Sequence, residues 1–172
     1  MAGIRENNIM IKTACGIAAL ALACCATSGA NAQLLTTKQL SLPIAVTIAQ
    51  TAIETCKQQG YNVSVHVIGN MGEILVAMRG DNTGPHTMEN SMRKALTSRG
   101  TRLPSGEFAE NVSKTPNAGG LRLGNMIPAR GALPIKAGQD TIGAVGVSGA
   151  PGGDKDEACA KAGIDKVADQ LK

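Results

Sequence analysis

The feature that most constrains the fold is a pair of short apolar segments joined by a turn. Val63, Val65 and Val67 alternate with Ser64 and His66, which is the two-residue period of a β-strand. Glycines and an asparagine at 69–72 supply a turn, and an apolar run follows at 74–78. The spacing therefore predicts an antiparallel hairpin. The same pattern predicts a second hairpin, with strands at 132–137 and 141–148.

Three segments have the 3.6-residue spacing of amphipathic helices: 44–56, 88–99 and 154–171. The first is preceded by an N-cap signal at 35–38 and stops at Gly60. The stretch 101–131 is rich in Gly, Pro, Asn and Ser, and we expect only loops and short helical turns there. Hairpins with helices between them predict a single α+β domain, with an antiparallel sheet covered by helices on one face.

Aromatic residues are nearly absent from the chain, which limits its partners. The 172 residues include one Tyr, one Phe and no Trp, so the core must consist of Val, Ile, Leu, Ala and Met. Proteins that stack single-stranded nucleic acid need aromatic rings, and phosphate-binding surfaces need a basic stripe. The net charge of +4 is not concentrated in one run. We therefore expect no nucleic-acid partner.

Residues 1–32 have the three-part pattern of a secretory signal peptide. Basic residues precede an apolar run at 14–26, and the small residues Ala30 and Ala32 form a cleavage signal. We expect cleavage after Ala32, which leaves a domain at 33–172 in the periplasm or the medium, without an integral membrane segment.

Three of the five cysteines lie within the predicted signal peptide. Cys24 among them follows a loose lipoprotein processing pattern, which is an alternative to soluble export. Only Cys56 and Cys159 remain after cleavage. They are either two small buried apolar residues or a disulfide, if the first and last helices pack side by side in an oxidising compartment.

The two histidines of the chain have different surroundings. His66 alternates with valines, and we expect it to be structural. His86 follows a Gly-Pro turn at the start of a helix, where an exposed neutral imidazole can ligate a metal; capping of a surface helix is the alternative. The chain lacks the spacing of a zinc centre, and no acid–base constellation supports an enzyme.

Several segments resemble the GlcG/HbpS family, also called the haem-degrading or haem-binding domain family. The most specific part is the glycine-rich strand 142–150 followed by the acidic helix start at 156–160, and 72–81 and 93–98 also match. The resemblance extends over roughly 35–171 and implies a compact α+β domain, with a sheet flanked by helices, that assembles into homo-oligomers.

The resemblance also implies a small-molecule ligand, with haem ahead of a corrinoid. His86 is then the candidate iron ligand, and Arg79, Arg93 and Lys94 are the candidate partners of the haem propionates. The alternatives are an enzyme that processes haem or another metabolite, and a corrinoid-binding or oligomeric interaction module. Whether the chain has catalytic activity stays open.

Overall fold

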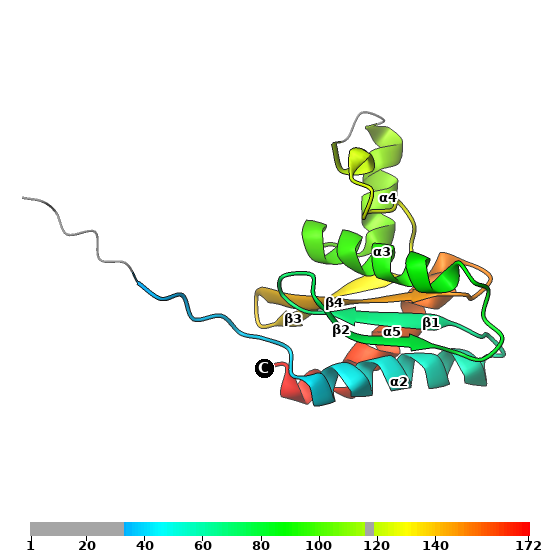
Figure 1. The fold of residues 1–172 in the computed structure, drawn as a ribbon, viewed down its shortest axis with the longest axis horizontal. Helices are drawn as coiled ribbons and strands as arrows, with labels where there is room; N and C mark the ends of the chain where they lie inside the picture. Colours follow the sequence, from blue (N-terminus) through cyan, green and yellow to red (C-terminus); the bar gives the residue numbers. More distant parts are fainter. Residues whose placement is uncertain (1–32, 116–118) are drawn as a thin grey trace, which may run out of the picture. The chain divides into compact units, whose positions relative to one another are not determined.

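The structure is a computed structural model that describes residues 33–115 and 119–172, and its compact unit is Thr37–Lys172. Its elements follow one another along the chain as α2 (Leu42–Gln58), β1 (Ser64–Ile68), β2 (Ile74–Arg79), α3 (Thr87–Thr101), α4 (Ser105–Lys114), the 3-10 turn η1 (Gly119–Arg122), β3 (Ala132–Ala137), β4 (Asp140–Ser148), α5 (Gly153–Lys166) and the 3-10 turn η2 (Ala168–Gln170) (Figure 1). The α+β class is confirmed.

The four strands form one antiparallel sheet in the order β2-β1-β4-β3. Each predicted hairpin makes half of this sheet, and the two halves meet where β1 pairs with β4. His66 of β1 lies opposite Ala77 of β2 on one side and Gly146 of β4 on the other.

Helices cover both faces of the sheet, not one as the pattern had predicted. α2 and α5 lie on one face and α3 on the other (Figure 1). Val65 and Val67 belong to the apolar core with α2 and α5, whereas the buried Ser64 and His66 form hydrogen bonds with α3. The polar side of β1 can be buried because α3 supplies hydrogen-bond partners for it.

The close approach of α3 to β4 depends on Gly146. A Cβ atom at this position would lie 2.8 Å from the backbone nitrogen of Ala95 and would also meet the carbonyl of Ser91. Only a residue without a side chain therefore lets the strand lie directly on the helix backbone. This contact fixes α3, which carries Arg93 and Lys94 and begins directly after His86.

Two local predictions were wrong. α2 begins at Leu42, with Ser41 at the N-cap, because Pro43 is accommodated in the first helical turn; the signal at 35–38 starts no helix. The stretch 101–131 contains a ten-residue helix, α4, which buries Phe108 and Val112.

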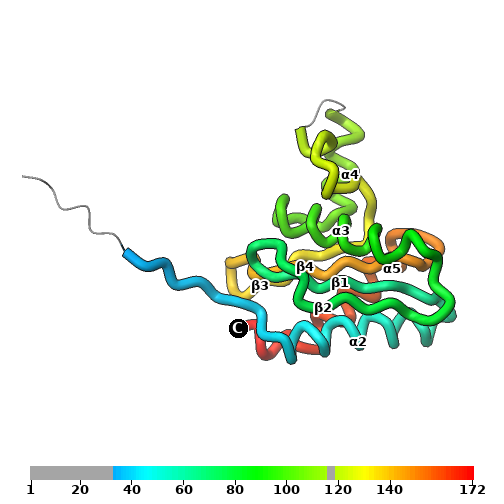
Figure 2. Tube along the Cα trace, viewed as in Figure 1, coloured from blue at the N-terminus to red at the C-terminus, as the bar shows by residue number. Residues whose placement is uncertain are grey.

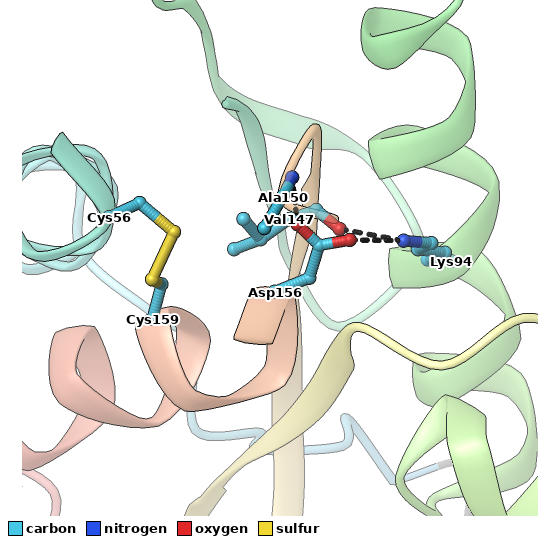
Figure 3. Close-up of a disulfide and its surroundings, with 6 residues drawn as sticks. All are labelled: Cys56, Lys94, Val147, Ala150, Asp156 and Cys159. Atoms are coloured by element: carbon cyan, nitrogen blue, oxygen red, sulfur yellow. Dashed lines mark hydrogen bonds and ion pairs between the residues drawn. A yellow bond between two sulfur atoms is a disulfide. The ribbon is translucent and has the colours of Figure 1, made fainter. Parts of the chain in front are cut away.

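A disulfide joins Cys56 of α2 to Cys159 of α5, and the two Cα atoms lie 5.6 Å apart (Figure 3). The two helices run side by side beneath the sheet (Figure 2), as the disulfide alternative required. Both cysteines are fully buried among Ala49, Ala52 and Ala160. The predicted signal peptide, with Cys24, lies outside the described residues. Within 33–115 and 119–172, no helix is both long and apolar enough to span a membrane.

Candidate functional site

His86 occupies the N-cap position of α3 and is exposed. Its side chain makes no capping hydrogen bond. The ring lies over the preceding turn, since a Cβ on Gly84 would be 2.8 Å from Cε1 of His86. The imidazole is thus positioned by the turn and faces solvent.

The two candidate arginines come from different elements. Arg79 ends β2, and its Nε and Nη2 donate to Oγ1 and the carbonyl oxygen of Thr83 at 3.1 and 2.9 Å. Those bonds hold its guanidinium against the loop that leads to His86. Arg93 lies two helical turns beyond His86 on α3 and donates through Nη2 to the carbonyl of Met126 at 3.3 Å. Its Nε is buried without a hydrogen-bond partner among the described residues.

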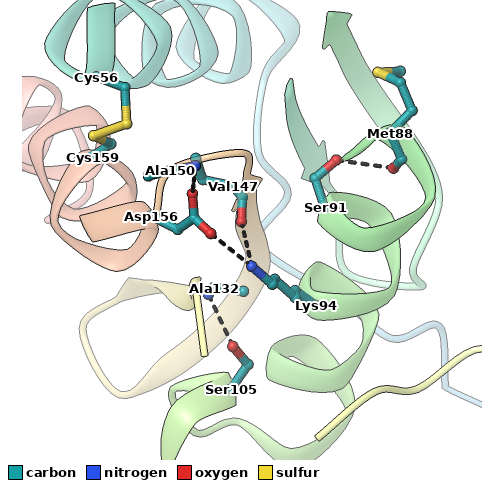
Figure 4. Close-up of polar contacts among 10 residues, drawn as sticks. All are labelled: Cys56, Met88, Ser91, Lys94, Ser105, Ala132, Val147, Ala150, Asp156 and Cys159. Carbon is teal, nitrogen blue, oxygen red and sulfur yellow. Dashed lines mark hydrogen bonds and ion pairs between the residues drawn. A yellow bond between two sulfur atoms is a disulfide. The ribbon is translucent and has the colours of Figure 1, made fainter. Parts of the chain in front are cut away.

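Lys94 must be withdrawn from the predicted ligand site. Its side chain is only 7% exposed, and its Nζ lies 2.8 Å from Oδ2 of Asp156 on α5 and 3.1 Å from the carbonyl of Val147 (Figures 3 and 4). Asp156 also accepts a hydrogen bond from the backbone N–H of Ala150. Lys94 therefore ties α3 to β4 and α5, and its charge is already neutralised inside the protein.

A glycine makes room for this ion pair. Gly131 has a φ of +133°, and a Cβ there would lie 2.7 Å from Nζ of Lys94 and 2.9 Å from Cβ of Asp156. Burial raises the pKa of Asp156, and the charge and hydrogen bond of Lys94 act in the opposite direction. The Lys94–Asp156 pair is therefore a structural feature of the fold.

His66 belongs to a buried polar contact between β1 and α3. Its Nδ1 lies 2.8 Å from Oγ of Ser91. This hydroxyl donates to the carbonyl of Met88 at 2.9 Å (Figure 4). Because the single hydroxyl proton is used in that bond, Nδ1 of His66 must be the donor and Nε2 carries no proton. Burial lowers the pKa of His66, which favours this neutral form.

His86 lines neither of two pockets in the described part of the chain. The first, which we call the Tyr61 pocket, has a volume of about 340 Å³ and lies between the last turns of α2 and the end of β2. Its lining includes Lys57, Tyr61 and Arg79. The sequence analysis did not single out Lys57 or Tyr61, although Tyr61 is the only tyrosine in the chain.

The second pocket is an open cleft of about 580 Å³ between the edge strand β3 and α5. Leu133, Pro134 and Ile164 give it apolar walls. Glu157 lines it as well, and burial raises the pKa of this carboxyl group. One oxygen of Glu157, Oε2, is buried without a hydrogen-bond partner in the described residues.

No group of three or more His, Cys, Asp or Glu side chains within 33–115 and 119–172 is arranged to hold a metal ion. The porphyrin supplies the other ligands of a haem iron, so one imidazole is enough to attach it to a protein. A single exposed histidine fits that requirement better than it fits a free metal ion.

Comparison with protein families identifies the family of this chain. The model of the family described as "Haem degrading protein HbpS-like" matches residues 40–165. The chain belongs to this family. A crystal structure of HbpS is 32% identical, covers 78% of this chain and 94% of its own, and has a TM-score of 0.75. No curated protein gives a significant match.

Two further solved structures are similar to this HbpS-like chain. A Streptomyces reticuli HbpS double mutant is 31% identical, covers 83% of this chain and 98% of its own, and has a TM-score of 0.75. A complex of PduOC with haem is 22% identical, covers 73% of this chain and 93% of its own, and has a TM-score of 0.68. At that identity the PduOC complex shows the shared fold alone.

Proposed function

We propose that this protein binds haem outside the cytoplasm. Membership of the HbpS-like family, whose model is described as a haem-degrading protein, is the observation that carries the proposal. A structure of the same fold in complex with haem adds support from the architecture. Export follows from the signal-peptide pattern at 1–32, and assembly into homo-oligomers follows from the family resemblance.

In the proposed site, His86 would hold the haem by ligating its iron. Its ring is exposed, precedes α3 and is held over Gly84, so a planar ligand can approach it from solvent. Arg79 and Arg93 are the proposed partners of the propionates, because each presents a guanidinium on the elements next to His86. The haem itself supplies the iron chemistry, and the protein contributes the ligand and the counter-charges.

An absorption titration of the purified protein with haem tests both the haem-binding function and the assignment of the residues that hold the haem. We expect the wild-type protein to shift the haem bands saturably and His86→Ala to weaken binding by at least tenfold. Arg122→Gln, which removes an exposed cation from η1, is the control for Arg79→Gln and Arg93→Gln. A corrinoid titrated in parallel measures selectivity between the two ligands.

The outcomes distinguish a failure of the haem-binding function from a failure of the ligand assignment. A wild-type protein that leaves the haem spectrum unchanged would remove the function. Haem binding that His86→Ala leaves unaltered would remove only the ligand assignment. Loss of binding in His66→Gln alone, in a variant that still unfolds cooperatively, would move the ligand to β1.

Degradation of haem is the second candidate, and the family description favours it. This activity requires that the porphyrin ring of bound haem be opened when a reductant is supplied with oxygen. Product analysis after incubation with haem and a reductant distinguishes this activity from binding, since a pure binding protein returns the haem intact.

A further inference from the structure

The Tyr61 pocket has apolar walls contributed by three elements of the fold. Ile53 comes from α2, Val63 from the residue before β1, and Met78 from β2. The backbone N–H of Gly80 donates to the carbonyl of Val63 at 3.0 Å, which fixes the two sides of the pocket relative to each other. Its volume of about 340 Å³ suits a small organic molecule or one arm of a larger ligand.

Cations outnumber acids around this pocket. Lys57 and Arg79 line it together with a single acid, Asp81. The ammonium of Lys155 lies 5.0 Å from the centre of the Tyr61 ring and adds to the positive field. The side chain of Arg79 lies on the α3 face of the sheet, because Arg79 pairs with Ser64, so Lys57 and Lys155 supply the positive charge. The pocket therefore combines two flexible ammonium groups with a hydrocarbon surface.

We propose that the Tyr61 pocket binds the carboxylate end of a short apolar acid. Lys57 binds the carboxylate, and Ile53, Val63 and Met78 contact the hydrocarbon chain. An inorganic anion would neutralise the cations but leave the apolar walls in contact with water, so an acid with a hydrocarbon chain is the better complement. The acid is a free molecule or a propionate arm of haem, and the second form rests on the function proposed above.

The chain carries a natural reporter for this site. Tyr61 is the only tyrosine and there is no tryptophan, so intrinsic fluorescence reports on the pocket alone. We expect hexanoate to change the Tyr61 emission saturably, and hexanol and inorganic phosphate to bind more weakly by about tenfold or more. Lys57→Gln should weaken hexanoate by about tenfold. Arg122→Gln, outside the pocket lining, should leave its affinity unchanged.

Haem and its dimethyl ester distinguish the two sources of the carboxylate. If a propionate arm enters the pocket, Lys57→Gln weakens the binding of haem but not of the ester, and this pattern supports the proposal even when hexanoate does not bind. Hexanol binding as tightly as hexanoate would overturn the proposal, as would Lys57→Gln altering the affinity of neither hexanoate nor haem. Saturable hexanoate binding by a protein that does not bind haem would remove the proposed function and leave this inference standing.

Discussion

Replacement of Lys94 by methionine tests the structural role of the buried ion pair. Met has a similar length but no charge, so Asp156 would lose its partner while staying only 4% exposed. Removing one member of a buried pair costs about 3–5 kcal/mol, because the remaining charge is neither solvated nor compensated. For a domain of this size we expect the unfolding temperature to fall by about 10–15 °C.

The pH dependence of that loss identifies its cause. Burial is the largest influence on the pKa of Asp156 and raises it, and without Lys94 the opposing effects of its charge and hydrogen bond disappear. The folded variant then binds a proton more readily than the unfolded chain does. Its instability is fully present at neutral pH and is relieved as the pH falls through the raised pKa of the folded state.

Urea unfolding followed by far-UV circular dichroism, at pH 7 and pH 5, measures both effects. The double variant Lys94→Met with Asp156→Asn should recover at least half of the loss, since a neutral amide can still accept the hydrogen bond from Ala150. A loss below about 1 kcal/mol at pH 7, or one that does not shrink at pH 5, would refute the account of a buried, mutually dependent pair.

Three further predictions concern other parts of the chain. Cys159→Ser should lower the unfolding free energy by up to about 4 kcal/mol, because the disulfide closes a loop of 103 residues. Reduction of the wild-type protein should have the same effect. Two thiols titrating in the denatured, unreduced mature protein would contradict the presence of the disulfide. Because burial lowers the pKa of His66, the unfolded chain binds a proton more readily, so stability should decline below about pH 6.5 in urea unfolding, while His66→Gln should show no such component. N-terminal sequencing of exported protein should begin at Gln33, and a lipid on Cys24 would contradict soluble export.

Short-range patterns predicted most of the fold. The strand at 132–137 has the bounds that the structure shows, and both hairpins were evident from the alternation and turn residues around them. The helix α4 was missed because it buries only two large apolar side chains, Phe108 and Val112, within a stretch rich in loop-forming residues. Its stability depends on tertiary contacts that no local pattern records.

The candidate site was harder to predict because it depends on distant partners. Lys94 follows Arg93 on an amphipathic helix and has the same charge, yet its partner Asp156 lies 62 residues further along the chain. The alternation at β1 placed His66 either on a less buried face or in a hydrogen bond, and α3 covers that face and presents Ser91 to His66. Charge and periodicity locate such residues on an element, whereas only the packing of elements shows which of them meet a ligand.

The disulfide links the fold to the proposed location of the protein. Disulfides persist in oxidising compartments and are rare in the reducing cytosol. Cys56 and Cys159 are the only cysteines beyond the predicted signal peptide, and they are bonded across the two helices that cover one face of the sheet. Retention of the chain in the cytosol would keep both thiols reduced and remove up to about 4 kcal/mol of stability. Export, as proposed, would therefore support the stability of the same domain that is proposed to bind haem. Deletion of residues 1–32 should then lower both the disulfide content and the amount of folded protein.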